Sequence, residues 1–195
     1  MLNTKRNLLG LMSGAALLPL LTSPGSLHAK PQGPQLNEFP NFVLETHEGK
    51  KVRFYDDLLK NKIVVINMLY TYCSGICPAN TSNLLEVQSA LGKRLGRDIF
   101  MYSLTLQPEF DRPEALKAYV KQRGIKPGWT LLTGKPDEME QIRRRLGFVD
   151  SDPVADADLS NHTGVVRVGN VALDRWFMMP AMSRPQQISR AILEL

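Results

Sequence analysis

The stretch Lys62–Tyr70, with the sequence KIVVINMLY, constrains the fold of this chain more than any other. It is a continuous apolar run rich in β-branched residues, and its length suits a strand better than a helix. A strand that is buried on both faces has this pattern, whereas a half-exposed strand alternates apolar and polar side chains. The run therefore predicts a central strand in a parallel sheet that is covered by helices.

The segments that follow alternate between helical and strand patterns. Apolar residues recur at helical spacing from Leu84 to Leu95, and a strand-like run, DIFMYSLTL, comes next. Pro113 opens a predicted helix that ends at Gly124, and it is followed by a short strand, WTLLTG, and a further helix, PDEMEQIRRRLG. This order is typical of βαβ units.

Both ends of the predicted domain carry antiparallel hairpins. FVLETHEGKKVRF alternates and turns at Glu48-Gly49, which indicates a small N-terminal hairpin. HTGVVRVGNVALDRWFMM is read as two strands around a Gly169-Asn170 turn, and RPQQISRAILEL as the final helix. Together these elements predict an α/β fold, a thioredoxin-like sandwich with a central mixed sheet, an N-terminal β-hairpin and an extra helix.

Length and composition fit one folded domain behind an N-terminal leader. The chain has 195 residues, of which 43% are hydrophobic and 22% charged, close to the globular average. Residues 1–29 join a basic start at Lys5-Arg6 to an apolar run and then to small residues, which is the layout of an export signal. We interpret residues 30–40 as a linker and residues 41–195 as the domain.

The leader favours an exported, periplasmic protein. Its apolar run, Leu8–Leu21, is shorter than the ~20 residues that a spanning helix needs, so a cleaved signal is favoured over a membrane anchor. Leu27 is not the small residue that a signal peptidase prefers before Ala29, so an uncleaved, membrane-tethered form stays open. Thr4-Lys5-Arg6 also has a weak likeness to a twin-arginine signal.

The charge pattern does not indicate a nucleic-acid partner. The formal net charge is +5, and the basic residues are spread along the chain. The densest run, Arg143-Arg144-Arg145, lies in a helical pattern without interleaved aromatic residues. We interpret this run as a solvated helix face.

The two cysteines, Cys73 and Cys77, lie in the loop after the central strand, at the predicted start of a helix, and Pro78 follows them. Positions four apart project from one face of a helix, so the two sulfurs can meet each other or a common partner. Backbone N–H groups at a helix start favour the thiolate, which is both the nucleophile in thiol exchange and a soft metal ligand. A plain structural disulfide would close only a short loop and so would stabilise the fold little.

A metal site needs a third donor, and the chain has three histidines. His28 lies at the signal junction, and we interpret His47 as an exposed turn residue. His162 precedes the first strand of the C-terminal hairpin, and in a thioredoxin-like sheet that loop faces the cysteine loop. A set of Cys73, Cys77 and His162 suits Cu(I), and with an added ligand Cu(II), whereas structural zinc would need a fourth protein ligand. An ordinary strand-edge role for His162 stays open.

The cysteine segment LYTYCSGICPANTSNLLEVQ resembles the Cys-x-x-x-Cys-Pro segment of the Sco/SenC family, which are thioredoxin-like copper chaperones that serve the binuclear copper centre of cytochrome c oxidase. The likeness runs from about Phe42 to the C-terminus and includes PEFDRPEALKAYV, LLTGKPDEMEQI and the histidine in NHTG. The resemblance implies that Cys73, Cys77 and His162 are copper ligands.

The chain departs from the usual family pattern at two positions. Gln107 stands before Pro108 where an aspartate is usual, and Asn161 stands before the histidine where an acidic residue is common. Both changes remove negative charge near the predicted site. If those acids help to bind Cu(II) or to dock on the partner, this chain would do either less well and could serve another cuproprotein.

Two functions compete at this point. A metallochaperone would bind copper and pass it to an apo-cuproprotein acceptor, for example a cytochrome c oxidase subunit, without being an enzyme. A thiol:disulfide oxidoreductase would use Cys73 and Cys77 as a redox-active disulfide, with a thiol reductant as partner, to keep acceptor cysteines reduced. A thiol peroxidase ranks last because no activating arginine motif is evident.

Three methionines follow the second strand of the predicted C-terminal hairpin. Because that strand should return to the end of the sheet where His162 lies, Met178, Met179 and Met182 are predicted to come near the cysteines. Methionines at a strand end usually fill the core. The alternative is that Met179 or Met182 is an auxiliary Cu(I) ligand, since thioether sulfur favours that ion.

Overall fold

The computed structural model describes residues 39–195, apart from the side chain of Ser160. The predicted export signal and most of the predicted linker lie outside the described residues. Phe39 is buried, and its ring lies 5.3 Å from that of Trp176 between centroids, so Phe39 belongs to the packed domain. Within residues 39–195, no helix combines the length and apolar character needed to cross a bilayer.

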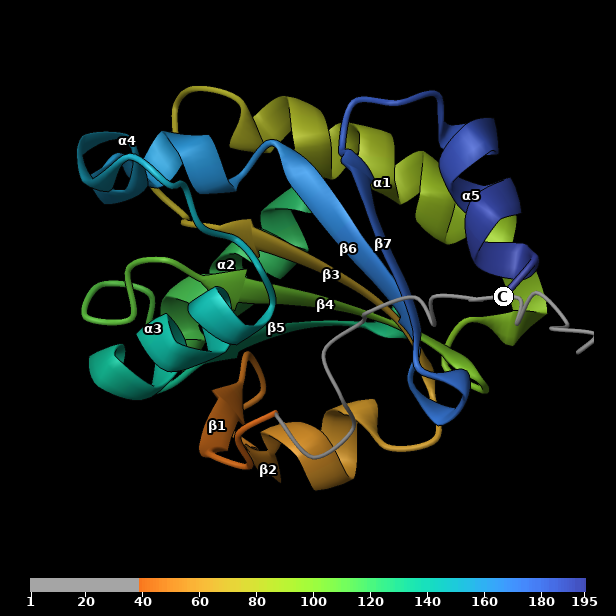
Figure 1. Cartoon of the computed structure of the whole chain (residues 1–195), viewed down its shortest axis with the longest axis horizontal. Helices are drawn as coiled ribbons and strands as arrows, with labels where there is room; N and C mark the ends of the chain where they lie inside the picture. Colours follow the sequence, from red (N-terminus) through yellow and green to blue (C-terminus); the bar gives the residue numbers. More distant parts are fainter. Residues whose placement is uncertain (1–38) are drawn as a thin grey trace, which may run out of the picture. The chain divides into compact units, whose positions relative to one another are not determined.

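The described part of the chain alternates strands and helices around one sheet (Figure 1). The elements in chain order are β1 (Val43–Thr46), β2 (Lys51–Arg53), the helical turn η1 (Phe54–Leu59), β3 (Ile63–Leu69), α1 (Cys77–Leu91), η2 (Gly92–Arg94), β4 (Ile99–Thr105), α2 (Pro113–Arg123), β5 (Trp129–Thr133), α3 (Pro136–Arg145), α4 (Pro153–Ala157), η3 (Leu159–His162), β6 (Val165–Asn170), η4 (Val171–Leu173), β7 (Arg175–Pro180) and α5 (Pro185–Leu193).

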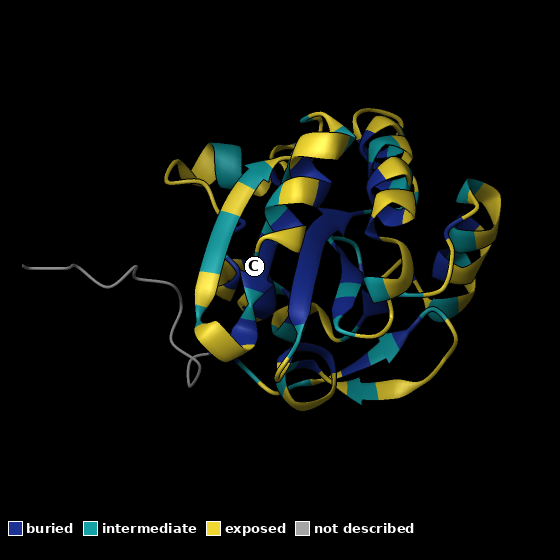
Figure 2. Cartoon of the chain, turned by 90° about the vertical axis from the view of Figure 1, so that its right-hand side faces the viewer, coloured by how far each residue is buried: buried dark blue, intermediate teal, exposed yellow. Residues whose placement is uncertain are grey.

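The strands form a mixed seven-stranded sheet in the order β2-β1-β5-β4-β3-β6-β7. β3 pairs in parallel with β4, and β4 with β5. The outer strands are antiparallel, with β6 against β3, β7 against β6, and the β1–β2 hairpin against β5. Every residue of β3 is buried, as its continuous apolar sequence predicts (Figure 2).

Two separate cores cover the two faces of the sheet. One contains side chains from α1, α2 and α5, together with Cys73 and Cys77. The other contains side chains from α3 and η1, including Phe54, Leu59 and Ile142. Alternate residues of β3 serve the two cores, with Val65 in the first and Ile66 in the second. The arrangement is a three-layer α/β sandwich, and it confirms the predicted fold class.

The C-terminal hairpin is antiparallel as predicted, but the predicted turn at Gly169-Asn170 is wrong. Both residues belong to β6, where Gly169 pairs with Trp176. The chain reverses instead at η4 and at Asp174, which has a φ of 49°. Gly169 is needed because a Cβ there would lie 2.2 Å from the Trp176 ring. Asn170 ends the strand, since its side chain accepts a hydrogen bond from the Leu173 N–H.

Candidate functional site

The loop that carries the cysteines leaves β3 at the carboxyl end of the parallel strands and enters α1 at Cys77. Open α/β sheets commonly place their sites at this end. Cys73 and Cys77 are both free thiols and are only 7% and 2% exposed. Pro78 occupies the first turn of α1, where its missing N–H removes no helical hydrogen bond.

Asp111, which the sequence interpretation did not single out, fixes the start of this loop. Its carboxylate is fully buried and accepts hydrogen bonds from the Thr71 backbone N–H at 3.1 Å, from the Thr71 hydroxyl and from the Thr105 hydroxyl. The same aspartate therefore joins the ends of β3 and β4 to the loop before α2. A buried carboxylate with several donors is a strong local constraint, so Asp111 positions the segment that leads to Cys73.

The two thiols differ in acidity. Burial raises the pKa of Cys73, but this effect is outweighed by hydrogen bonds from the Cys77 thiol, the Cys77 backbone N–H, the Tyr70 hydroxyl and the Gly75 backbone N–H, so its pKa lies below the ordinary value. Burial and the hydrogen bond to Cys73 raise the pKa of Cys77 to about 12. The hydrogen bond to Cys73 also raises the pKa of Tyr70 to about 12. Cys73 is thus the thiol that ionises first, and Cys77 and Tyr70 are hydrogen-bond donors to it.

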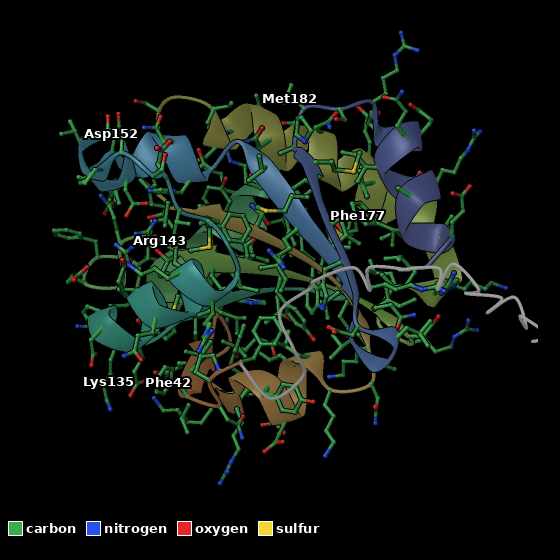
Figure 3. All side chains as sticks on the ribbon, in the orientation of Figure 1. Phe42, Lys135, Arg143, Asp152, Phe177 and Met182 are labelled. Carbon is green, nitrogen blue, oxygen red and sulfur yellow. The ribbon has the colours of Figure 1, made fainter. Side chains whose placement is uncertain are left out.

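His162 is buried at the end of η3, and its imidazole contacts Asp156 and Arg143. Its Nε2 lies 2.7 Å from the Asp156 carbonyl oxygen, and the Arg143 Nη1 lies 3.1 Å from the same ring nitrogen. Arg143 belongs to α3, on the opposite face of the sheet from α1, and Figure 3 shows its side chain on the side of α3 that faces α4. Within residues 39–195, no three His, Cys, Asp or Glu side chains converge on one metal position.

The backbone beside His162 nevertheless contacts the cysteine helix. The Thr163 carbonyl oxygen accepts a hydrogen bond of 2.6 Å from Asn80 Nδ2 on the first turn of α1. The Thr163 side chain also hydrogen bonds to Cys77 and acts to lower the pKa of that thiol. The structure therefore brings together Cys73, Cys77 and the residue that follows His162, but not the imidazole itself.

The interpretation of Arg143 as part of a solvated helix face is wrong. Arg143 is 5% exposed, and its guanidinium group forms ion pairs with Glu140 at 2.7 Å and with Asp156 at 2.9 Å. These hydrogen bonds, to Asp156 first and then to Glu140, raise the pKa of Arg143, and in turn hold the pKa of Asp156 far below its usual range. Arg143 shares a helical stripe with Met139, Ile142 and Leu146, and that spacing is the sequence signal for its burial.

Of the other two histidines, only His47 falls within residues 39–195. His28 lies outside the described residues. His47 was expected to be exposed, but it is half-buried, and its Nδ1 accepts a hydrogen bond from the Leu131 backbone N–H at 3.2 Å. Burial lowers the pKa of its imidazole.

The predicted neighbouring residues Gln107 and Asn161 have backbone-supporting roles. The Gln107 carbonyl oxygen accepts from the Asp111 N–H at 2.8 Å, which closes the turn before α2. Asn161 Nδ2 donates to the Ala155 carbonyl oxygen at 2.8 Å and so ties η3 to α4. Their side chains supply no negative charge.

The methionine segment returns to the end of the sheet where Thr163 lies. The Ala181 N–H donates to the Gly164 carbonyl oxygen at 2.9 Å, and Asn83 on α1 holds the same loop through the Ala181 and Ser183 carbonyl oxygens. Met179 packs against the core that contains both cysteines, whereas Met182, labelled in Figure 3, is 52% exposed. Met178 approaches Arg167 instead, with 3.8 Å between its sulfur and Nη1.

Comparisons with known proteins identify the family. The family model described as SCO1/SenC matches residues 30–193, which is most of the chain. The chain belongs to the SCO1/SenC family. Among curated members, it is 29% identical over 136 residues to the SCO1 protein homolog of Bacillus subtilis, covering 68% of this chain and 67% of that protein. It is 26% identical over 182 residues to a SCO2-like protein of Rickettsia conorii, covering 87% of each.

Solved structures of SCO1/SenC proteins share the fold described above. Bradyrhizobium japonicum ScoI with copper bound aligns with a TM-score of 0.61 at 22% identity, covering 78% of this chain and 96% of that one. Yeast Sco1 with copper bound gives a TM-score of 0.61 at 20% identity, covering 78% and 88%. BsSco, a member of the Sco family of cytochrome c oxidase assembly proteins in which a disulfide switch was identified, gives 0.66 at 20% identity, covering 85% and 95%.

Proposed function

We propose that this SCO1/SenC protein is an exported copper-binding metallochaperone that delivers copper to a cuproprotein such as the binuclear copper centre of cytochrome c oxidase. The observation that carries the proposal is the pair of free, buried thiols at the start of α1, of which Cys73 has a lowered pKa. Two adjacent sulfur donors, one easily ionised, match the preference of Cu(I) for soft thiolate ligands.

Two of the three proposed copper donors, Cys73 and Cys77, are already close together in this structure. Cys73 and Cys77 already share a hydrogen bond, so no large movement is needed to bring their sulfurs to one ion. His162, the proposed third donor, is adjacent to Thr163, whose side chain contacts Cys77. Copper-bound Sco structures from Bradyrhizobium japonicum and yeast support copper as the cargo.

Export is supported by the composition of the leader and by a relative. Residues 1–29 have the basic, apolar and small-residue regions of a signal. A SCO1/SenC family member of known structure from Bacillus anthracis is a lipoprotein. We propose a periplasmic location, with cleavage of the signal favoured over retention as an anchor.

Thiol:disulfide exchange is the second candidate, and the unequal acidity of the two thiols favours it. The Cys73 thiolate would attack a disulfide of the acceptor and form a mixed disulfide, and the first acceptor thiolate would leave and take up a proton. Cys77, once deprotonated, would then attack the Cys73 sulfur and release the second acceptor thiol. Two electrons pass to the acceptor, and this chain is left with a Cys73–Cys77 disulfide. The disulfide switch in BsSco supports this alternative.

A Cu(I) titration against a competing chelator tests the metallochaperone proposal. We expect the reduced chain to bind one copper ion, and we expect Cys73→Ser and Cys77→Ser each to abolish tight binding, because a hydroxyl cannot replace a thiolate. Ser74→Ala, which changes an exposed residue of the same loop, is the matched control. Unchanged copper stoichiometry in both cysteine variants would refute the proposed ligands.

The His162→Ala variant separates the two candidate functions. Copper transfer needs the imidazole as a ligand, whereas thiol exchange does not. We therefore expect weaker binding of copper, especially of Cu(II), with thiol exchange retained. A variant that keeps its copper affinity and loses thiol exchange would favour the oxidoreductase.

A further inference from the structure

Asn80 places an unpartnered acceptor atom beside the two thiols. It lies three residues after Cys77 on α1, and its side chain is 2% exposed. Its Nδ2 donates to the Thr163 carbonyl oxygen, but its Oδ1 is buried and has no hydrogen-bond partner in the described part of the chain. A buried amide oxygen without a donor is unfavourable, so its place in the structure needs an explanation.

Asn80 is singled out when the other buried side-chain atoms of this kind in residues 39–195 are considered. Those atoms are Arg123 Nε, Thr133 Oγ1 and Arg167 Nε. Guanidinium nitrogens donate and cannot accept a hydrogen bond. Thr133 ends β5, which is separated from β3 by β4. The Asn80 oxygen is therefore the unpartnered acceptor at the cysteine end of α1.

Arg143, the present partner of His162, does not need the imidazole. Its Nε donates to Glu140, its Nη2 to Glu140 and Asp156, and its Nη1 to Asp156 and to the Phe148 carbonyl oxygen. Five N–H groups thus have five oxygen contacts, which is the full capacity of a guanidinium group. Departure of His162 would leave Arg143 fully hydrogen bonded.

A histidine that ligates a metal through one ring nitrogen usually donates its other ring N–H to an oxygen, which fixes the orientation of the ring. If His162 leaves Arg143 and the Asp156 carbonyl oxygen, it needs such an acceptor. Asn80 is already tied to the next residue of the chain through Thr163. The imidazole of His162 can therefore turn from Arg143 toward the two thiols while the Thr163 backbone stays hydrogen bonded to α1.

We propose that Asn80 is the positioning residue for His162 in the copper-loaded protein. Its Nδ2 holds the His162–Thr163 segment against α1, and its Oδ1 accepts the ring N–H of His162 when the imidazole joins Cys73 and Cys77. This inference rests on the proposed function. It gives His162 two positions, one on Arg143 in the metal-free chain and one between Asn80 and the copper ion.

The test compares Asn80→Leu, which removes both polar groups, with Asn80→Asp, which keeps an acceptor and loses the donor to Thr163. The full chain is loaded with Cu(II), the dissociation constant is measured by competition, and pulsed EPR records the remote nitrogen of the coordinated imidazole. We expect Asn80→Leu to weaken Cu(II) binding about tenfold or more and to shift the remote-nitrogen frequencies. Asn80→Asp, which loses the donor but keeps an acceptor, should weaken binding less than Asn80→Leu does and should keep the frequencies close to those of the wild type.

Gln88→Leu is the matched control, because Gln88 is also a buried amide on α1 and bonds only to Lys126. If Asn80→Leu acted only by lowering the free energy of unfolding, Gln88→Leu would have the same effect. We expect the EPR spectrum of Gln88→Leu to equal that of the wild type. Binding and frequencies in Asn80→Leu that equal those of the wild type would overturn the proposal. The same holds if the frequencies shift in Asn80→Asp as they do in Asn80→Leu, since the retained acceptor would then not be the group that orients the ring.

The metal-free chain supplies a second readout. We expect the ring ¹⁵N signals of His162 in the wild type to differ between the metal-free and the Cu(I)-loaded chain, because the ring contacts Arg143 in the metal-free state. Identical signals in the two states would overturn the two-position scheme. Wild-type protein that shows no imidazole nitrogen on copper would refute the proposed function itself, whereas an imidazole signal insensitive to Asn80→Leu refutes only this inference.

Discussion

Cys73 and Cys77 share one loop but have opposite pKa shifts. Cys73 receives hydrogen bonds from the Cys77 thiol, from backbone N–H groups and from Tyr70, whereas Cys77 is more deeply buried and donates. The same asymmetry serves either proposed function, because the thiolate is both the first metal ligand and the attacking nucleophile.

Alkylation of the reduced, metal-free chain should therefore begin at Cys73. At neutral pH we expect iodoacetamide to modify Cys73 before Cys77, as judged by peptide mass spectrometry. Cys77→Ala removes hydrogen bonding from the Cys77 thiol, so the pKa of Cys73 should rise and its alkylation rate should reach half-maximum at a higher pH. Preferential modification of Cys77 in the wild type would contradict the assigned acidities.

The methionines near the site are expected to act mainly through packing. Met179 packs against the core that contains both cysteines, as a core-filling side chain does, and Met182 is largely exposed. Leucine keeps most of the volume of methionine and removes the sulfur. We predict that the double variant Met179→Leu, Met182→Leu keeps its Cu(I) affinity within about twofold. A tenfold loss of affinity at unchanged unfolding free energy would instead establish a thioether ligand.

Side chains in the connections between elements help to hold the site in place. Asp111 ties the start of the cysteine loop to the end of β4, and the Arg143–Asp156 ion pair ties α3 to α4. Neither carboxylate stands out in the sequence, because an aspartate in a loop, such as Asp111, or in a short helix, such as Asp156 in α4, is usually exposed to solvent.

Replacing Asp111 should loosen the cysteine loop. Asp111→Ala leaves the Thr71 N–H, the Thr71 hydroxyl and the Thr105 hydroxyl without their acceptor. We expect a loss of about 1–3 kcal/mol or more in the free energy of unfolding, measured with urea, and faster amide exchange at Thr71. Asp111→Asn keeps the shape and one acceptor oxygen, so it should lose less. Equal stability of wild type and Asp111→Ala would refute this role.

The Arg143–Asp156 ion pair should make stability depend on pH in acid. The pKa of Asp156 is depressed in the folded protein, and near 3.9 in an unfolded chain. The stabilisation is thus fully present above the unfolded value and is lost as the pH falls toward the folded one. Urea unfolding between about pH 6 and pH 2.5 should show a smaller decline for Asp156→Asn than for the wild type. Asp137→Asn, an exposed carboxylate on α3, should behave as the wild type does. Parallel pH curves for wild type and Asp156→Asn would contradict the pair's contribution.

At the scale of the whole molecule, the sequence predicts the sheet better than it predicts the site. The continuous apolar run of β3 can be satisfied only by burial on both faces, and the later strand and helix patterns have clear start and stop residues, so the mixed sheet and its order of elements follow. The position of the two cysteines, at the carboxyl end of the parallel strands, follows from their place in the sequence directly after β3. The turn after β6 was misplaced because Gly169 serves the close approach of Trp176 rather than a turn.

The resting position of His162 could not be predicted in this way. It depends on Arg143 from the opposite face of the sheet and on Asp156 from a short helix, and local periodicity carries no information on such long-range contacts. The sequence places His162 in the correct loop, at the cysteine end of the sheet. The direction in which its imidazole points is decided by tertiary hydrogen bonds.

The central claim is that Cys73, Cys77 and His162 together hold copper. X-ray absorption at the copper edge of the loaded, reduced chain measures the ligand atoms directly. We predict two sulfur neighbours and one imidazole nitrogen, with the nitrogen contribution lost in His162→Ala and the two sulfurs retained. A spectrum of the wild type with fewer than two sulfurs, or one that His162→Ala leaves unchanged, would contradict the account.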